Sequence, residues 1–373
     1  MHGVMSGEPI WPNIEVPPDD LAIVEAVTAR YGMRLVRAIF GLVNHVYLLH
    51  PSASHSDYPE GITAKIPVAG STESQPHREV TSLELLHELP NPPLQLPQLL
   101  EFDESTGTRI FATLPGMTET GRAISDLLGP PALYRFGKRV GRLHAWQEGL
   151  KPEHFIERLR AVGANPSSGF ETSIAWLRTF DHPSTPTLTR TVANELEKIR
   201  SHRPDGMHPA NKVVHMDCRP ENVLCRQLPD RSYAPTGYID HEALSLGDSE
   251  SSMRFWPIAG SAVLDGCIDG YREATGVTLN REVIVHWARL QALLVAAGQV
   301  SRGVPRFRTL RTAYINLQYN LLPDTDWHEL LNPGLVYANT ESPANLELWR
   351  TECEYLAQIA SINPSAVRLR DIT

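Results

Sequence analysis

The segment VVHMDCRPENVLCR, residues 213–226, constrains the fold of this chain more than any other stretch. An apolar run leads into a polar, turn-rich stretch, and a second apolar run follows, which predicts two short strands joined by a loop. The loop carries His215, Asp217 and Asn222. A later strand-like run, TGYID, ends at Asp240. The question is which chemistry needs these side chains together.

Phosphoryl transfer needs such a set. A carboxylate held on a loop, as Asp217 would be, can orient a substrate hydroxyl and receive its proton. The side chains of Asn222 and Asp240 offer hard oxygen ligands of the kind that Mg²⁺ accepts alongside phosphate groups. The spacing therefore indicates a centre that positions an acceptor, binds phosphates and neutralises their charge.

The first third of the chain predicts a small sheet with helices. Residues 19–31 begin with acidic residues and continue with apolar ones at helical spacing, so they predict a helix. Runs rich in β-branched residues predict strands at 33–40, 44–50, 61–68 and 108–114. Residues 75–89 predict an amphipathic helix with Pro76 in its first turn, which the loop NPPLQLP ends. The sequence LPG at 114–116 marks the end of this sheet region.

The character of the sequence changes after residue 117. Helical periodicity marks residues 132–149, 189–202 and 281–300. Strand-like runs occur around the opening segment, at 212–215, 222–226 and 236–240. We therefore predict an α+β fold of two lobes: a small antiparallel sheet lobe at 1–116 and a larger, mainly helical lobe at 117–373. A chain of 373 residues is too long for one ordinary core, which also favours two lobes.

Composition excludes several classes of protein. Hydrophobic residues make up 42% and charged residues 21%, as in soluble globular proteins. A formal charge of −9 argues against a nucleic-acid partner bound through a broad basic surface. The four cysteines form no C-x-x-C pair, so neither a zinc knuckle nor a disulfide framework is indicated. No signal peptide is evident, and no apolar run approaches the ~18 residues of a membrane span. We expect a cytoplasmic protein without a membrane partner.

The motifs resemble one known family. HMDCRPENVL followed by GYIDHEALSLGDSE is similar to the aminoglycoside phosphotransferase-like branch of the kinase fold, whose pattern is roughly H-G-D-x-x-x-x-N, then I-D-W/F, then G-D-P. GLVNHVYLL resembles the nucleotide loop and second strand of that family, ITAKI its lysine-bearing strand and REVTSLELLHEL its glutamate-bearing helix. FATLPG resembles the hinge between the lobes and VGRLHAW the first helix of the large lobe. The similarity spans residues from about 20 to about 300.

The resemblance assigns nucleotide binding to the lobe at 1–116 and catalysis and substrate binding to the lobe at 117–373, and it implies a role for each matching residue. Asp217 would be the catalytic base, and Arg219 would neutralise charge near the transferred group. Asn222 and Asp240 would bind Mg²⁺. The co-substrate would be ATP or GTP, with contacts in the nucleotide-binding lobe from Asn44 over the phosphates, Lys65 on the α- and β-phosphates, Glu79 paired with Lys65, and the backbone of Leu114 at the hinge. The backbone of Leu114 would contact the nucleobase, because its neighbour Pro115 has no N–H to donate.

Several positions depart from the family pattern. Met216 and Glu221 replace glycines and are expected to crowd the loop, while His241 stands where an aromatic residue is usual. Ser252 stands where an aspartate is usual, which we expect to weaken a structural hydrogen-bond network. The nucleotide loop contains only Gly41.

Alternative interpretations remain open. His215 fits a structural role better than a catalytic one, and Glu84 competes with Glu79 on the same helix. His215, Asp217, Asp240 and His241 are ligand types for a zinc or manganese hydrolase, although that leaves Lys65 without a role. A kinase-like binding protein without turnover is a third class.

The resemblance implies a hydroxyl-bearing small molecule as the acceptor, and it favours an antibiotic, of nucleoside or aminoglycoside type, and a resistance role. A polycationic aminoglycoside needs an acidic pocket. Acidic and basic residues are nearly balanced over 261–373, and Arg302, Arg306, Arg308 and Arg311 form a basic cluster. This balance favours a neutral acceptor, such as a nucleoside-type or macrolide-like antibiotic. A kinase of primary metabolites, such as homoserine, choline or a sugar, is the alternative.

Overall fold

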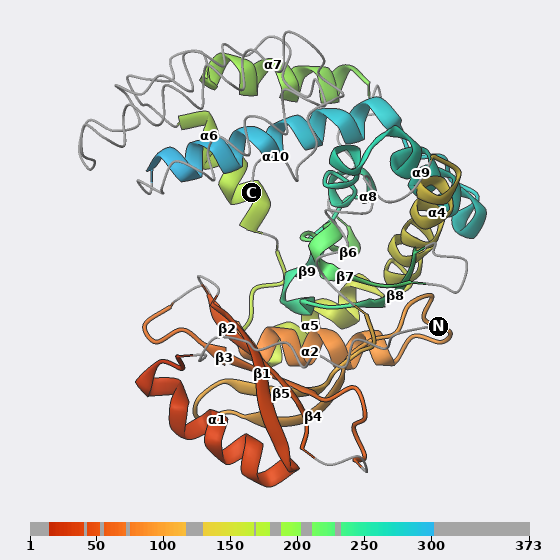
Figure 1. Cartoon of the computed structure of the whole chain (residues 1–373). Coiled ribbons are helices and arrows are strands. Elements are labelled where there is room, and N and C mark those ends of the chain that lie inside the picture. Colours follow the sequence, from red (N-terminus) through yellow and green to blue (C-terminus); the bar gives the residue numbers. More distant parts are fainter. Residues whose placement is uncertain are drawn as a thin grey trace, which may run out of the picture.

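The computed structural model describes residues 15–40, 43–52, 56–71, 75–116, 130–167, 169–179, 188–202, 211–227 and 233–301. Within this part the predicted α+β class is confirmed, because a five-stranded sheet is followed by a mainly helical region (Figure 1). Gly41 and the cluster of Arg302, Arg306, Arg308 and Arg311 lie outside the described residues. So do residues 117–129, so the lobe boundary at 116 and 117 stays a prediction.

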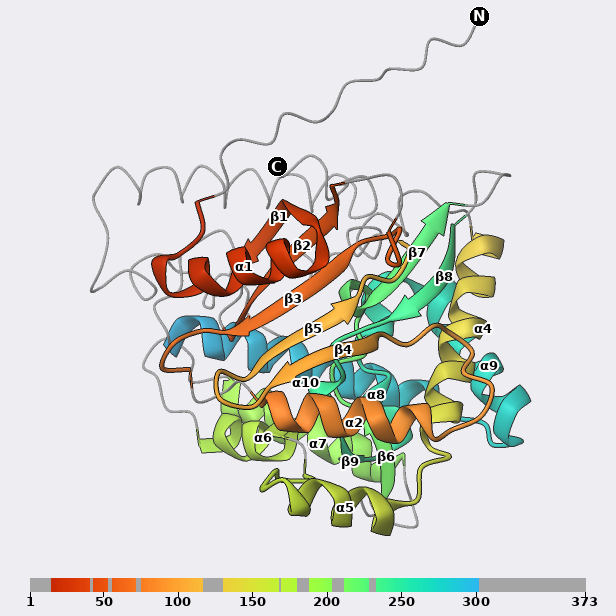
Figure 2. The same ribbon diagram turned by 90° about the horizontal axis from the view of Figure 1, so that it is seen from below.

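The sheet is antiparallel, in the order β1-β2-β3-β5-β4 (Figure 2). Its strands are β1 (Met33–Phe40), β2 (Asn44–Pro51), β3 (Ile62–Pro67), β4 (Gln98–Asp103) and β5 (Thr108–Ala112). Four of them match the predicted strands. Strand β4 had no prediction, because the predicted loop NPPLQLP ends at residue 97, just before it. The strand lies at the sheet edge and is mostly half-buried, so its apolar and polar residues do not alternate.

Two helices cover opposite faces of this sheet, and both were predicted. Helix α1 (Pro18–Tyr31) packs through Val24 and Val27 on a core that contains Ile110 of β5. Helix α2 (Pro76–His87) packs on a core that contains the next residue, Phe111. Successive side chains of a strand point to opposite faces of the sheet, so Ile110 faces α1 and Phe111 faces α2.

The helical region has two cores. One joins α4 (Pro130–Gln147) to α9 (Ser261–Thr275), and the other joins α6 (Gly169–Thr179), α7 (Leu188–Ser201) and α10 (Arg281–Ser301). Helices α5 (Pro152–Ala161) and α8 (Ser249–Ser252) complete the helices that the structure describes in this region. Helices α4, α7 and α10 match predicted helices, whereas α5 and α6 had no prediction.

Two short ladders position the motif loops. Strand β6 (Lys212–His215) pairs with β9 (Leu244–Gly247), and β7 (Val223–Gln227) pairs with β8 (Tyr233–Tyr238). His215 lies opposite Leu244 in the first ladder, and Val223 lies opposite Tyr238 in the second. Residues 216–222 and 239–243 therefore leave the ladders side by side. Strand β9 was not predicted.

Over the described ranges, no helix is both long and apolar enough to cross a bilayer.

Candidate active site

His215 joins the two motif loops. Its Nδ1 accepts a hydrogen bond from the backbone N–H of Asp217 at 3.2 Å, and its Nε2 donates to the carbonyl oxygen of Asp240 at 2.9 Å. Burial holds the pKa of His215 well below its ordinary value, so the ring is neutral and both nitrogens are engaged. The geometry agrees with a structural role for this residue, as the sequence indicated.

The side chain of Asp217 is held by Asn222. The Nδ2 of Asn222 donates to the backbone oxygen of Asp217 at 2.8 Å and to its Oδ2 at 3.1 Å. The half-exposed Arg219 places Nε 3.3 Å from the same Oδ2. Burial raises the pKa of Asp217, which makes its carboxylate a better proton acceptor, although Arg219 acts in the opposite direction.

Asp240 faces the sheet from an unusual backbone conformation. Its φ of 70° and ψ of 48° lie in the left-handed region, which Asp visits more readily than most residues. Its Oδ1 is 2.6 Å from Nζ of Lys65 on β3. Burial disfavours the charged form, but Lys65 outweighs this effect and lowers the pKa of Asp240 to about 2, so the carboxylate is ionised.

Lys65 also contacts Glu79. The Nζ of Lys65 is 3.0 Å from Oε1 of Glu79, and both side chains are buried. Burial acts against the charge of Lys65, yet the carboxylates of Asp240, Glu79 and Glu242 raise its pKa above the ordinary value. Glu84, the competing candidate, is exposed and binds Arg158 instead.

Two charged residues that the sequence did not single out complete this group. Arg109 on β5 is fully buried, and its Nη1 is 2.9 Å from Oε2 of Glu79. Oε2 of Glu242 lies 3.8 Å from both Nζ of Lys65 and Nη1 of Arg109. Burial raises the pKa of Glu242 to about 7. The sequence signal for Glu242 was its place in the IDHE run, two positions after Asp240.

The remaining predicted nucleotide contacts are Asn44, at the start of β2, and Leu114, just after β5. The Oδ1 of Asn44 accepts a hydrogen bond from Arg109 at 2.6 Å, so its side chain is part of the buried charge group. Leu114 lies beside Gly237 of β8, where an added Cβ would be 2.9 Å from Leu114 Cδ1. Thr236 donates to the carbonyl oxygen of Pro115 at 2.9 Å, which ties the hinge segment to β8. The proposed roles of Asn44 and Leu114 stay predictions.

The bulky Met216 is accommodated by a glycine. Met216 is buried among residues of α6 and α10. A Cβ on Gly247 of β9 would lie 3.0 Å from Sδ of Met216 and 2.6 Å from Cγ2 of Val214. The absence of a side chain at Gly247 therefore makes the room that Met216 needs.

The other departures are also accounted for. Neutral His241, whose pKa burial lowers to about 3, lies edge-on against Tyr238 at 5.0 Å and so fills an aromatic position. Ser252 is buried, donates to the carbonyl oxygen of Ser249 at 2.8 Å and lies 3.1 Å from Nδ1 of His144. Ser252 therefore forms a hydrogen-bond network of its own. The side chain of Glu221 lies outside the described residues.

Arg254 supports the loop that carries Met216 and Asp217. It donates through Nη2 to the carbonyl oxygen of Met216, through Nη1 to that of Ser251 at 2.9 Å and through Nε to Gln291 at 2.8 Å. Its guanidinium lies 4.0 Å from the ring centre of Phe170 and 4.5 Å from that of Phe255. Burial lowers the pKa of Arg254 to about 10, so it stays charged at neutral pH.

The oxygen donors fit Mg²⁺ better than a transition metal. Asp240 is ionised and Asn222 supplies an amide, a pair of hard ligands that needs phosphate oxygens to complete a coordination shell. Among the described residues, no group of three or more His, Cys, Asp and Glu side chains is placed to hold a metal ion. Both ring nitrogens of His215 are engaged with the backbone. The geometry therefore disfavours the zinc or manganese hydrolase.

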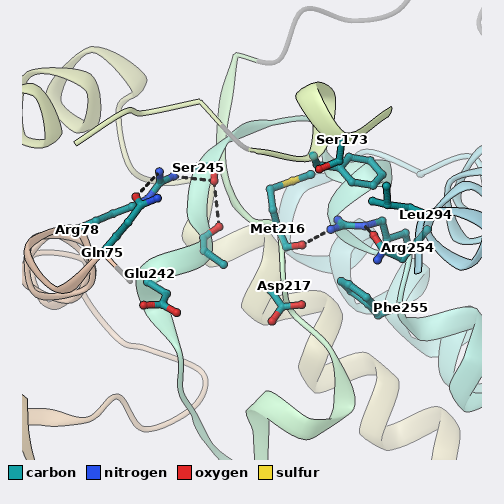
Figure 3. A pocket seen from close by; sticks show the side chains of 13 residues that line it. Gln75, Arg78, Ser173, Met216, Asp217, Glu242, Ser245, Arg254, Phe255 and Leu294 are labelled. Carbon is teal, nitrogen blue, oxygen red and sulfur yellow. Dashed lines mark hydrogen bonds between the residues drawn. The ribbon is translucent and has the colours of Figure 1, made fainter. Parts of the chain in front are cut away.

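A pocket of about 310 Å³ opens beside Asp217 (Figure 3). Asp217 lies at its base, between one side formed by α2 and β9 and another formed by α6, α10 and the segment after α8. Its lining residues are Gln75, Arg78, Phe170, Ser173, Met216, Asp217, Glu242, Ala243, Ser245, Arg254, Phe255, Gln291 and Leu294. A molecule in this pocket would present its atoms to the carboxylate of Asp217.

The fold is shared with solved phosphotransferases. No protein-family model matches the chain, and no curated protein is detectably similar to it. APH(2")-IIia in complex with GDP and kanamycin gives a TM-score of 0.56 at 13% identity, over 90% of this chain and 99% of the other. Macrolide 2'-phosphotransferase MphH from Brachybacterium faecium gives 0.53 at 16% identity, over 83% and 100%. Wild-type aminoglycoside 2'-phosphotransferase-IIIa, as its GDP complex, gives 0.56 at 12% identity, over 81% and 98%. These similarities confirm the two-lobed, kinase-like fold.

Proposed function

We propose that this chain is a small-molecule kinase that transfers the γ-phosphoryl group of ATP or GTP to a hydroxyl of its acceptor. One observation carries the proposal: Asp217, which lines the pocket, is held by Asn222 on its own loop and interacts electrostatically with Asp240 on the next loop, which is paired with Lys65 on the sheet. This is the residue set that phosphoryl transfer needs, on a fold that phosphotransferases share.

In the proposed reaction Asp217 orients the acceptor hydroxyl and takes its proton. The acceptor oxygen forms a bond to the γ-phosphorus, the bond from that phosphorus to the β–γ bridging oxygen breaks, and the nucleoside diphosphate leaves. Lys65, fixed by Glu79, binds the α- and β-phosphates, and Asn44 and the Leu114 backbone complete the nucleotide contacts. Asn222 and Asp240 would hold Mg²⁺, which neutralises phosphate charge when bound. Arg219 adds positive charge near the transferred group.

The acceptor that we propose is an antibiotic, of nucleoside or aminoglycoside type, with resistance as the biological role and the cytoplasm as its location. One similar structure contains kanamycin, and another is a macrolide 2'-phosphotransferase. A primary-metabolite kinase is the alternative. The buried ion pairs around Lys65 support turnover over a binding-only protein, because the charged groups of a kinase centre are all present.

The test is acceptor phosphorylation by wild type and by Asp217→Asn, with Mg²⁺ and a panel of hydroxylated antibiotics and metabolites. The Asn side chain keeps the shape but cannot take a proton, so we expect turnover to fall at least 100-fold with nucleotide binding retained. Asp265→Asn, at an exposed carboxylate that binds Arg281, is the control and should act like wild type. Equal turnover in Asp217→Asn and wild type would refute the proposed base, and a chain that binds neither ATP nor GTP would refute the kinase.

A further inference from the structure

The pocket beside Asp217 has two chemically different sides (Figure 3). Gln75, Arg78, Glu242 and Ser245 line one side, and all four are polar. On the opposite side, the apolar side chains of Phe170, Met216, Phe255 and Leu294 are interrupted by the polar Ser173, Arg254 and Gln291. A molecule that fills the pocket therefore needs one polar part and one apolar part.

The two cations of the lining are committed to the protein. Arg78 donates to the carbonyl oxygens of Asn165 at 2.6 Å and Leu244 at 2.8 Å, and to Oγ of Ser245 at 2.9 Å. Arg254 donates to backbone oxygens and stacks between two phenylalanine rings, as described above. A guanidinium that is fixed in this way is a poor receptor for an anionic acceptor, since the Nη groups of both arginines already have partners in the protein.

Of the two carboxylates in the lining, one faces cations of the protein and one faces the pocket. Asp217 and Glu242 are the acidic residues of the described lining. Oε2 of Glu242 is buried and lies 3.8 Å from Nζ of Lys65 and Nη1 of Arg109, so this oxygen faces cations of the protein itself. Asp217 is then the carboxylate that remains for a ligand, and Arg219 lies beside it. A polyamine would lose hydration from several ammonium groups and find one carboxylate, which is unfavourable in a partly buried site.

Taking the proposed function as its basis, we propose that the acceptor is a neutral, amphipathic molecule rather than a polycation. Its hydroxyl-bearing part lies against the polar side and reaches Asp217, and a flat apolar part lies against Phe255 and Leu294. The pocket volume of about 310 Å³ is near the lower end of the ~300–1,000 Å³ of small-molecule pockets. Nucleosides and aryl glycosides have this size and this division into a sugar and a flat ring.

The test measures binding apart from turnover. The full chain, with Mg²⁺ and a non-hydrolysable ATP analogue, is titrated with uridine, adenosine and an aryl glucoside as neutral probes and with kanamycin as the polycation. We expect at least one neutral probe to bind at least tenfold more tightly than kanamycin. Tighter binding of kanamycin, or binding by none of the neutral probes, would overturn the proposal.

A pair of matched variants tests the role of pocket charge. Leu294→Glu adds a carboxylate to the apolar side, and Leu294→Gln adds a neutral group of the same shape. We expect Leu294→Glu to bind kanamycin at least tenfold more tightly than Leu294→Gln does, and equal binding would overturn the charge argument. Neutral probes that bind but are never phosphorylated would count against the kinase reaction and leave the pocket assignment standing. Phosphorylation of kanamycin but of none of the neutral probes would support the kinase reaction and overturn the pocket assignment.

Discussion

Lys65 and Arg109 stand opposite each other in the β3–β5 ladder, and both cations bind the carboxylate of Glu79. Lys65 takes Oε1 and Arg109 takes Oε2, at 3.0 and 2.9 Å. Arg109 also donates to Asn44 on β2. Because both oxygens of Glu79 are engaged, the carboxylate has one orientation, and it holds Lys65 where Lys65 also reaches Asp240.

Replacing Glu79 with Gln should lower both stability and nucleotide affinity. The change removes the charge that two buried cations share, and the loss of one partner from a buried ion pair costs about 3–5 kcal/mol. We expect denaturant unfolding to show a loss in this range and nucleotide titration to show at least tenfold weaker binding, because Lys65 loses its support.

Glu84→Gln is the matched control for this prediction. Glu84 lies on the same helix, but its side chain is 55% exposed and binds Arg158. Exposed ion pairs contribute about 0–1 kcal/mol, so this variant should resemble wild type. If the two variants lost equal stability, the assignment of Glu79 as the shared partner would be wrong.

The sequence identified the charged group only in part, and Arg109 shows why. Asn44, Lys65 and Arg109 lie on neighbouring strands and face α2, which the alternation of each strand allows. Alternation places a side chain on a face, but it does not tell which residues of two strands stand opposite each other. That register brings Arg109 beside Lys65, so its position became visible only in the structure.

The fold was predictable where periodicity was strong and not where pairing decided the outcome. Strand β3 and helix α2 carry clear patterns that match their positions. Strand β4 is mostly half-buried at the sheet edge and β9 has only four residues, so their patterns are weak and pairing with a partner strand decides that they form. Helix α5 begins with Pro152 in its first turn, a position that favours the start of a helix and is visible in the sequence.

Arg254→Lys should destabilise the catalytic loop. A lysine cannot donate to Met216, Ser251 and Gln291 together, nor lie flat between two phenylalanine rings. Hydrogen bonds that involve a charged group contribute about 1.5–3 kcal/mol each, so we expect a loss of at least ~2 kcal/mol in urea unfolding. Nucleotide turnover should fall with nucleotide affinity unchanged, because Met216 adjoins Asp217 in the loop. Wild-type turnover in this variant would contradict a positioning role.

His144 should make the fold sensitive to acid. Burial lowers the pKa of His144 to about 3, against 6.5 in an unfolded chain. Between these values the unfolded chain binds a proton that the folded chain does not, so stability falls as pH drops from 6.5 toward 3. Below pH 6.5, His144→Gln should reduce the slope of unfolding free energy against pH by up to about 1.4 kcal/mol per unit. His50→Asn, at an exposed position, provides the comparison, and an unchanged slope in His144→Gln would refute the prediction.

Gly141→Ala should separate α4 from α9. A Cβ at Gly141 would lie 2.0 Å from the carbonyl oxygen of Cys267, and neither atom belongs to a flexible side chain that can turn away. The helices would have to move apart, and such overpacking costs about 1–3 kcal/mol or more. This exceeds the ~1 kcal/mol that alanine gains over glycine within a helix. Thermal unfolding should therefore show a lower Tm.

A second glycine separates packing from backbone strain. Gly276, which caps α9 with a φ of 76°, has open space around its Cα, so Gly276→Ala should reflect the unfavourable left-handed conformation alone, about 1–2 kcal/mol. Gly141 lies in the contact between α4 and α9 and does not line the pocket beside Asp217, so the folded fraction of Gly141→Ala should retain turnover per molecule at low temperature. A variant as stable as wild type would show that the two helix backbones are not in contact, and lost turnover at full folding would show that the helix pair positions the catalytic loop.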